Sequence, residues 1–470
     1  MGSLLCRAPA LLLLESCLLA LFLRDGGIPL WGVLSVAQFV LGGQMLISEE
    51  RWAARKALFA GGLFVLSLTL PLWLCLELER EEPLPGSLTG RFMVTDRRPW
   101  GNGELLQLED GAGAGWIAAA PRQMKGVVEG DLVRFSAQVA PLKVEGERSE
   151  FSPSRYWRAR GVRGELRNIS AYGFIGKSFS IHRFRQLLRE RIEKLPPKSG
   201  ALTAAVLLGD REASLREDHR RWGTSHILAV SGWHVALALA LACVIFGTRR
   251  SGLLCGSVFL WFYCLVSGAS MSALRAAAML QISMAGLWFG RSRSLVNALS
   301  VAGVLMLLRN PWTAFDVGWQ LSVLAALTLA GLEALGDWGA ALLSSPVMWF
   351  MTSPLIAPMA GGLYLSSLPI NAVASVVFSF ILGIVLLSAL PVLAGLEWYF
   401  FSLPAELLLK LWALVADWWT DLLPRALPVN FFPAWLCAAA LYLLAARALR
   451  LSWVRSFLLC LSGGFLVFLI

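Results

Sequence analysis

Long apolar blocks constrain the fold of this sequence more than any other feature. Residues 9–23, 28–48 and 57–76 form three such blocks, and more follow from residue 224 to the end of the chain. Each is close to the roughly 20 apolar residues with which an α-helix crosses a bilayer. Hydrophobic residues make up 57% of the chain and charged residues 15%, against about 45–50% and about 25% in soluble proteins. The sequence therefore predicts a polytopic α-helical membrane protein and excludes a soluble enzyme, a disordered scaffold and a fibrous repeat.

The apolar blocks and the positive charges between them predict a topology. Within residues 1–78 the expected spans are the three blocks above; within residues 223–470 they lie near 226–247, 252–267, 272–290, 295–308, 315–335, 341–363, 369–394, 398–416, 432–448 and 452–470. Three prolines and two glycines are expected to break the 341–363 span. Because basic loops lie in the cytoplasm, the basic residues at 51–56 place the third span's end outside it.

Residues 83–170 differ in kind, because they contain short β-rich runs separated by turn residues. The five runs cover 88–96, 104–110, 115–120, 131–140 and 161–170. Five short strands in about 90 residues fit a small all-β domain, and an OB-like barrel is one such domain. A fragment of a β-sandwich fits the pattern nearly as well. The topology places this domain on the extracytoplasmic side, inserted after the three N-terminal spans.

Nearly all of the net charge of +10 lies in one stretch after these strands. Residues 83–150 have 8 Lys or Arg and 9 Asp or Glu, whereas residues 151–221 have 16 and 7. Within residues 181–222, the segment 181–195 has the apolar spacing of an amphipathic helix, expected to lie on the membrane surface with a basic face, and a charged hinge follows it. This excess, on the outer side, fits either anionic lipid or a polyanion such as nucleic acid.

Aromatic residues alternate with arginines in the segment 152–163, which is typical of surfaces that bind single-stranded nucleic acid. The candidate DNA-binding residues are those of this segment and of the amphipathic helix: Arg155, Tyr156, Trp157, Arg158, Arg160, Arg183, Arg185 and Arg189. An alternative is that Tyr156 and Trp157 close the barrel or contact the membrane. The eight cysteines all lie in apolar segments, where they are expected to be small buried side chains.

Several polar residues interrupt the apolar spans, and charged groups there are costly unless they face partners or water. These residues are His226, Ser231, His234, Arg275, Asp316, Gln320 and Asn371. In one interpretation Arg275 pairs with Asp316 and the histidines bind backbone carbonyls; in a second, the residues line a pore. A third is an intramembrane serine protease using Ser231 or Ser270 with a histidine. A zinc site from His226, His234 and Asp210 is the weakest alternative.

The run LLGDREASLREDHRRWGTSHILAVSGWHV (207–235) resembles the signature of the ComEC competence family. Segments 267–277, 289–299, 310–322 and 368–377 agree with that family in order and spacing. The resemblance covers roughly residues 85–420. It implies an inner-membrane channel that admits transforming single-stranded DNA, with an OB-like domain outside the cytoplasm. It also implies that Asp210, His226, Ser231, Gly232 and His234 form a motif core, and that Arg275, Asp316 and Gln320 are polar positions of the channel.

The sequence departs from the family where many members continue into a metallo-β-lactamase-like nuclease. It ends at Ile470 without an H-x-H-x-D-H metal cluster, so we expect no catalytic activity, no metal and no cofactor. No nucleotide-binding G-x-x-x-x-G-K-[ST] loop occurs either. The expected partners are single-stranded DNA, membrane lipids, a separate nuclease, an extracytoplasmic DNA receptor and a cytoplasmic ATPase. The alternative function is a small-solute transporter or an intramembrane serine protease.

Overall fold

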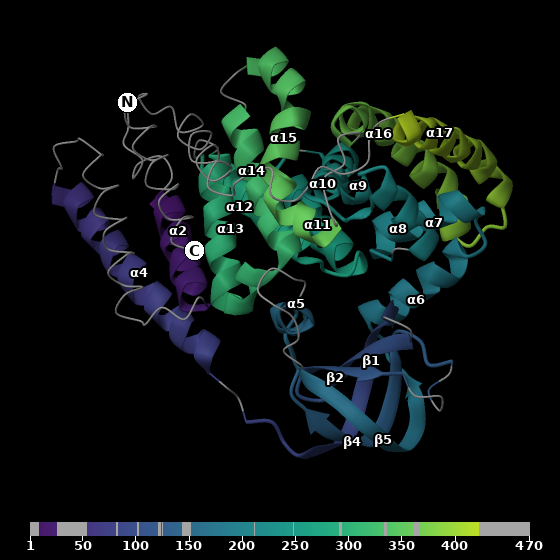
Figure 1. Ribbon diagram of the computed structural model, residues 1–470, viewed down its shortest axis with the longest axis horizontal. Helices are drawn as coiled ribbons and strands as arrows, with labels where there is room; N and C mark the ends of the chain where they lie inside the picture. The colour runs from purple at the N-terminus through teal and green to yellow at the C-terminus, as the bar shows by residue number, and fades with distance from the viewer. Residues whose placement is uncertain are drawn as a thin grey trace.

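The computed structural model shows a β-barrel joined to a larger helical region (Figure 1). It describes residues 9–25, 54–80, 83–100, 103–120, 124, 126–142, 152–210, 212–247, 249–290, 294–332, 336–360 and 367–422. The predicted spans 28–48, 432–448 and 452–470 lie outside these residues.

The barrel is built from β1 (Ser87–Trp100), β2 (Gly103–Asp110), β3 (Gly115–Ala119), β4 (Asp131–Ala140) and β5 (Val162–Lys177). The five predicted runs are confirmed as strands. The strand order is β1-β2-β3-β5-β4, and β4 pairs with β1 to close the barrel. Neighbours are antiparallel, except that β3 and β5 are parallel. This closure decides for a barrel over a sandwich fragment.

Alternating side chains explain why these strands close on a core. In β4 every second residue from Asp131 to Ala137 is buried, as expected when one face of a strand points inward. Phe92 and Phe135 stack at the centre, with ring centroids 4.2 Å apart and about 1% of each side chain exposed. The barrel therefore has an apolar interior filled by side chains.

The helical region has two groups of helices, on either side of α10, α11 and α15 in Figure 1. One group contains α2 (Pro9–Asp25), α4 (Ala54–Glu79), α12 (Met271–Trp288), α13 (Leu295–Arg309), the 3-10 helix η2 (Pro311–Phe315) and α14 (Val317–Leu332). The other contains α6 (Ile181–Ile192), α7 (Pro197–Leu208), α8 (Ala213–Arg221), α16 (Ser367–Leu393), η4 (Tyr399–Ser402) and α17 (Leu403–Leu422). The remaining helices are α5 (Pro153–Ala159), α9 (Ser225–Leu228), α10 (Gly232–Phe246), α11 (Arg250–Val266) and α15 (Gly336–Ala360).

Most predicted spans in the described ranges coincide with a helix, but two predictions were wrong in detail. The 226–247 segment is two helices, because the chain is extended at Ser231, whose side chain caps α10. The 341–363 segment is not broken at its prolines, since α15 runs through Pro346, Pro354 and Pro358. Hydroxyls of Thr352 and Ser353 donate to carbonyls of this helix, the kind of local hydrogen bonding that accompanies prolines in membrane helices.

Two helical segments are long and apolar enough to cross a membrane by themselves, Val376–Leu393 and Tyr399–Leu422. Shorter apolar helices of 10–17 residues lie at Gly232–Phe246, Ser251–Val266, Leu295–Arg309 and Val317–Leu332. The chain is therefore mostly helical, with a small closed barrel and two candidate membrane spans in its described part.

A glycine brings the barrel close to α6. Gly130 precedes β4 with a φ of +88°, and a Cβ atom there would lie 2.7 Å from the backbone nitrogen of Arg183. Gly126 in the same loop has a φ of +96°, but a Cβ there would meet nothing within 4 Å. Both positions favour glycine by conformation, but only Gly130 is also required by packing.

We predict that Gly130→Ala lowers the thermal unfolding midpoint of the purified protein more than Gly126→Ala does. The left-handed conformation costs each alanine about 1–2 kcal/mol, and Gly130→Ala adds a clash with the backbone of α6. The intrinsic fluorescence of the tryptophans reports unfolding. Equal midpoints for the two variants would contradict close packing between the barrel and α6.

Candidate functional site

One side of the barrel is held to the first helix group through α5. The Arg155 guanidinium donates to both carboxylate oxygens of Asp25 in α2, at 3.1 and 2.9 Å. Arg160 donates to Asp316 Oδ2 at 2.7 Å, and Asp316 is only 4% exposed. Asn310 Nδ2 donates to the carbonyl of Arg158 at 2.7 Å. Helix α5 therefore connects the barrel to α2, η2 and the start of α14.

The aromatic residues of α5 face the barrel. Trp157 is 2% exposed and packs with Ile117 and Val162. Tyr156 stacks edge-on against Trp157, and its hydroxyl accepts a hydrogen bond from Arg98 in β1 at 3.0 Å. In the structure these two aromatic residues thus contact the barrel strands. Arg158 lies over the Trp312 ring, 4.6 Å from its centroid.

The other side of the barrel is held to α6 through Glu129. The side chain of Glu129 is fully buried, and it accepts hydrogen bonds from Arg185, from Arg189 Nη2 at 2.9 Å and from His182 Nδ1 at 3.2 Å. Arg189 also donates to Asp210 Oδ2 at 2.8 Å. Two arginines predicted to bind DNA thus lie in an ion-pair network, whereas Arg183 has no ion-pair partner among the described residues.

This network perturbs the protonation of its members. Burial disfavours the charged carboxylate of Glu129, but the hydrogen bond from His182 and the charges of Arg185 and Arg189 outweigh it. They hold the pKa of Glu129 below its ordinary 4.5. A carboxylate with a lowered pKa stabilises the folded state above its unfolded pKa, and this stabilisation is lost as the pH falls through the folded pKa. Glu129 is therefore ionised at neutral pH.

We predict that Glu129→Gln destabilises the protein by about 3–5 kcal/mol at neutral pH, because it leaves the buried guanidinium of Arg185 without its carboxylate. The wild-type thermal midpoint should fall as the pH is lowered from neutral through the depressed pKa of Glu129, because the carboxylate is then protonated. The variant should lose this part of the pH dependence. Glu104→Gln, at an ion pair with a half-exposed carboxylate, is the control and should keep it. The same pH dependence in both variants would contradict the assignment.

Between the two helix groups and the barrel lies a cavity of about 3330 Å³. Its lining runs from Arg97 and Gln107 in the barrel to Ser345 and Ser379 in α15 and α16. All nine predicted motif positions line it: Asp210, His226, Ser231, Gly232, His234, Arg275, Asp316, Gln320 and Asn371. The structure thus brings residues separated by up to about 160 positions to one space.

Arg275 is the most unusual residue of this cavity. It is 4% exposed, and its Nε donates to Ser322 Oγ at 2.8 Å. Asp316 instead pairs with Arg160, so the interpretation that Arg275 pairs with Asp316 was wrong. Across the described ranges, no carboxylate forms an ion pair with Arg275. Its Nη2 lies 3.3 Å from where a Cβ would stand on Gly232, at the start of α10.

Ser231, Ser270, Gln320 and Asn371 each have a structural partner within the protein. Ser231 caps α10, with His234 Nδ1 3.0 Å from its hydroxyl, and the Ser270 side chain caps α12 by accepting from the Ala273 amide. Gln320 donates to the carbonyl of Ala314 at 2.8 Å, and Asn371 to that of Gly223 at 3.3 Å.

These contacts bear on two of the open interpretations. The serines of the protease interpretation serve as helix caps here. In the described part of the chain, no three His, Cys, Asp or Glu residues form a group that could hold a metal, so the alternative zinc site at Asp210, His226 and His234 was wrong.

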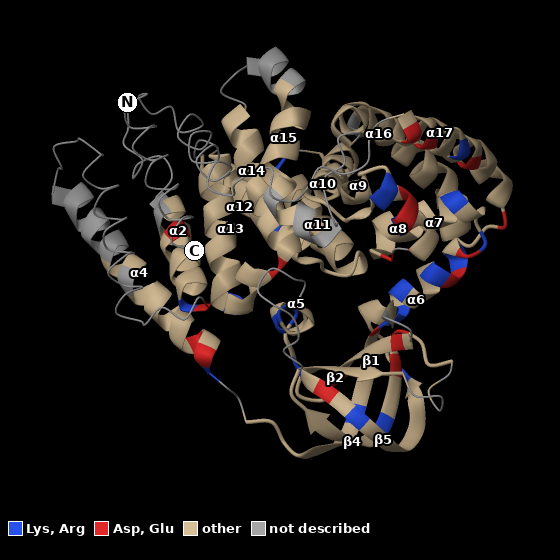
Figure 2. Cartoon of the chain, in the orientation of Figure 1, with Lys and Arg blue, Asp and Glu red and all other residues tan. Residues whose placement is uncertain are grey.

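Sequence reasoning missed two arginines on the outer face of the barrel. Arg91 in β1 and Arg134 in β4 are directly opposite each other and both exposed. Neither has an ion-pair partner among the residues that the structure describes. Like charges in this position destabilise a sheet, which favours a function for them. The near-neutral charge of residues 83–150 hid this pair, although strand pairing between 88–96 and 131–140 would have revealed it. Figure 2 shows basic residues on the strands and along α5 and α6.

Comparison with known proteins identifies the family. Residues 206–454 match the family described as Competence protein, which is more than half of the chain. The chain belongs to the competence protein family. Over 143 residues it is 34% identical to ComE operon protein 3 of Bacillus subtilis (strain 168), and this segment is 29% of the chain and 18% of that relative. The match thus spans less than a fifth of the curated relative. No solved structure matches the chain.

These findings confirm the resemblance to ComEC-type competence proteins. The matched segment contains all nine motif residues that line the cavity, whereas the barrel and α6 precede it.

Proposed function

We propose that this competence protein forms a membrane channel through which single-stranded DNA enters the cytoplasm. The observation that carries this proposal is the cavity, because the motif residues of the family converge on it from α9, α10, α12, α14 and α16. A passage for a polyanion needs polar and cationic groups along its wall. The guanidinium groups of Arg275, Arg97, Arg98 and Arg160 line the cavity.

The buried charge of Arg275 supports this function. A guanidinium held among apolar helices is costly unless it faces water or an anion, and its hydrogen bond to Ser322 leaves its charge without a counter-ion from the described chain. Arginine binds phosphate through paired donors in a fixed geometry. A phosphate of the passing strand would supply the missing negative charge.

The barrel would meet DNA first. We interpret the barrel as an OB-like domain, because its five strands close in one sheet. We place it outside the cytoplasm and interpret the helical region as a polytopic membrane domain. Arg91 and Arg134 would bind phosphates on the barrel's outer face, while Arg155, Arg160, Arg185 and Arg189 hold the barrel over the cavity. Energy for transport, degradation of the second strand and capture of DNA would come from partners: a cytoplasmic ATPase, a separate nuclease and an extracytoplasmic receptor. The chain itself would have no catalytic function.

We predict that Arg275→Ala abolishes natural transformation although the variant inserts into the membrane in normal amounts. Loss of the buried cation removes the counter-charge for phosphate within the cavity. Transformation frequency and membrane fractionation measure the two effects. Arg309→Ala is the control, because Arg309 also lines the cavity but is exposed, and it should leave transformation largely unchanged. Normal DNA uptake by Arg275→Ala would contradict a role in transport and leave Arg275 with only a structural role beside Ser322.

We also predict that binding of single-stranded DNA to the purified protein weakens steeply with salt. Each phosphate contact contributes about −0.7 to the slope of log K against log salt for single strands, so Arg91→Gln with Arg134→Gln should reduce the slope by about 1.4. Replacing both residues by lysine retains the charges and should retain the slope. Salt-independent binding, or the same slope in the glutamine variant, would contradict phosphate binding at this pair.

A further inference from the structure

The orientation of α6 differs from that expected for a helix with one face in water. Arg185 and Gln186 are buried, at 5% and 8% exposure, whereas Phe184 and Leu187 are 39% and 38% exposed. Of its basic residues, Arg185 and Arg189 are turned toward Glu129 and Asp210. The outer surface of the first half of α6 is therefore substantially apolar.

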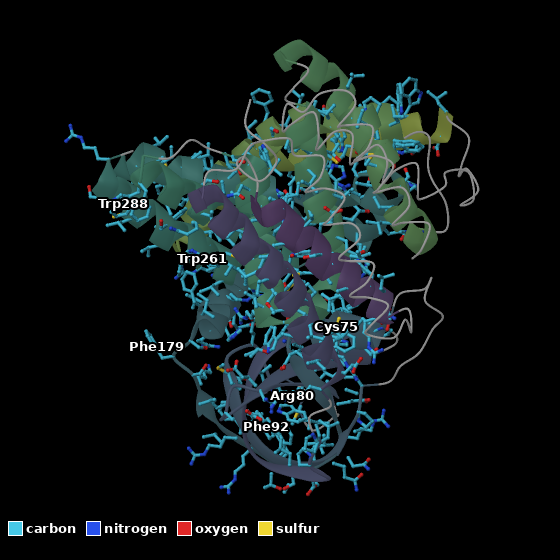
Figure 3. All side chains as sticks on the ribbon, turned by 90° about the vertical axis from the view of Figure 1, so that its left-hand side faces the viewer. Cys75, Arg80, Phe92, Phe179, Trp261 and Trp288 are labelled. Atoms are coloured by element: carbon cyan, nitrogen blue, oxygen red, sulfur yellow. The ribbon has the colours of Figure 1, made fainter. Side chains whose placement is uncertain are left out.

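More apolar side chains are exposed just before this helix. Phe179 is fully exposed at 110% of its reference area, and Phe174 and Ile175 at the end of β5 are 55% and 44% exposed. With Phe184 and Leu187 they make five exposed apolar side chains within 14 residues, which we call the Phe179 patch. Such a concentration of exposed apolar groups marks an interaction site. Figure 3 shows Phe179 projecting from the protein between the barrel and the helices, on the same side as Trp261 and Trp288.

The patch is continuous with the apolar outer surface of α11. The rings of Phe184 and Phe262 have centroids 5.7 Å apart, and along α11 Val258 and Leu254 are 72% and 51% exposed. A helix with such a surface is suited to lipid rather than water. Because the Phe179 patch extends the apolar surface of α11 toward the barrel, we expect the patch and α11 to face the same apolar environment.

Two cations accompany the phenylalanines. Lys177 is exposed and Arg183 is partly exposed, and neither forms an ion pair within the described segments. Aromatic rings with flanking lysine and arginine are the residues that anchor proteins where acyl chains meet headgroups. Positive charge there attracts anionic lipid. The combination favours a phospholipid bilayer over a second protein surface.

We infer that the Phe179 patch inserts into the outer interface of the bilayer, with Phe179 among the acyl chains and Lys177 and Arg183 at anionic headgroups. The barrel is thereby anchored to the membrane independently of any nucleic acid. The inference rests on the proposed placement of the helical region in a membrane, but not on DNA transport.

Photo-crosslinking of the full-length protein in nanodiscs of phosphatidylethanolamine and phosphatidylglycerol tests this. p-Benzoylphenylalanine replaces Phe179, and mass spectrometry identifies the adducts after irradiation. The positive control is the same group at Leu387, which is 69% exposed on α16; the negative control is at Arg91 on the barrel. We expect phospholipid adducts at positions 179 and 387 but not at 91, with phosphatidylglycerol enriched at 179 above its fraction in the nanodisc.

The outcomes separate the two claims. Adducts at 387 without adducts at 179 would overturn the patch and leave the membrane placement intact, whereas adducts at neither position would overturn both. A crosslinked dimer at 179 would assign the patch to a second copy of the chain and overturn the inference. Lys177→Gln with Arg183→Gln should abolish the phosphatidylglycerol enrichment while adducts persist; unchanged enrichment would contradict the headgroup assignment.

Discussion

Buried ion pairs hold the barrel over the cavity, and the geometry of the remaining structure depends on them. Glu129 joins the barrel to α6, and Asp316 joins α14 to Arg160 beside α5. Removing charges from water is costly, and only good geometry with further hydrogen bonds offsets that cost. Both carboxylates meet this condition, since Glu129 accepts from three side chains and Asp316 also accepts from the Trp319 amide at 2.9 Å. The barrel thus bridges both helix groups, with the cavity between them.

The arginines and lysines differ in whether they pair with a carboxylate of the chain, and this difference indicates which of them have a structural role. The arginines paired with Asp25, Glu129 and Asp316 lie at the barrel junctions and fix relative positions. Five of the described cations that form no ion pair lie elsewhere: Arg91 and Arg134 on the barrel face, Arg275 in the cavity, and Lys177 and Arg183 beside exposed phenylalanines. Each of these places offers a surplus positive charge to an anion that the chain does not supply. Phosphates of DNA fit the first two, and phospholipid headgroups fit the third.

Local patterns predicted much of this fold, and tertiary pairing explains what they missed. Alternation and turn residues located all five strands, because those signals lie within about ten residues. Ion pairs between distant residues cannot be predicted from local patterns, and Arg160 and Asp316 are 156 positions apart. The arginines of the segment 152–163 therefore suggested DNA binding, although Arg155 and Arg160 form ion pairs that hold the barrel in place. Likewise, apolar spacing predicted the helix beginning at Ile181, but its orientation depends on Glu129 in another element. The polar positions of the cavity were found because polar residues are conspicuous in apolar spans.

The central claim is that single-stranded DNA passes through the cavity beside Arg275, and trapping a strand in transit tests it most directly. A single strand with photoreactive groups along its backbone and a bulky block at its trailing end would be arrested during uptake and crosslinked in intact cells. The account predicts crosslinks to cavity residues on several helices, such as Met279 and Gln320. Crosslinks confined to the barrel surface, or to lipid-facing residues such as Val258, would contradict it.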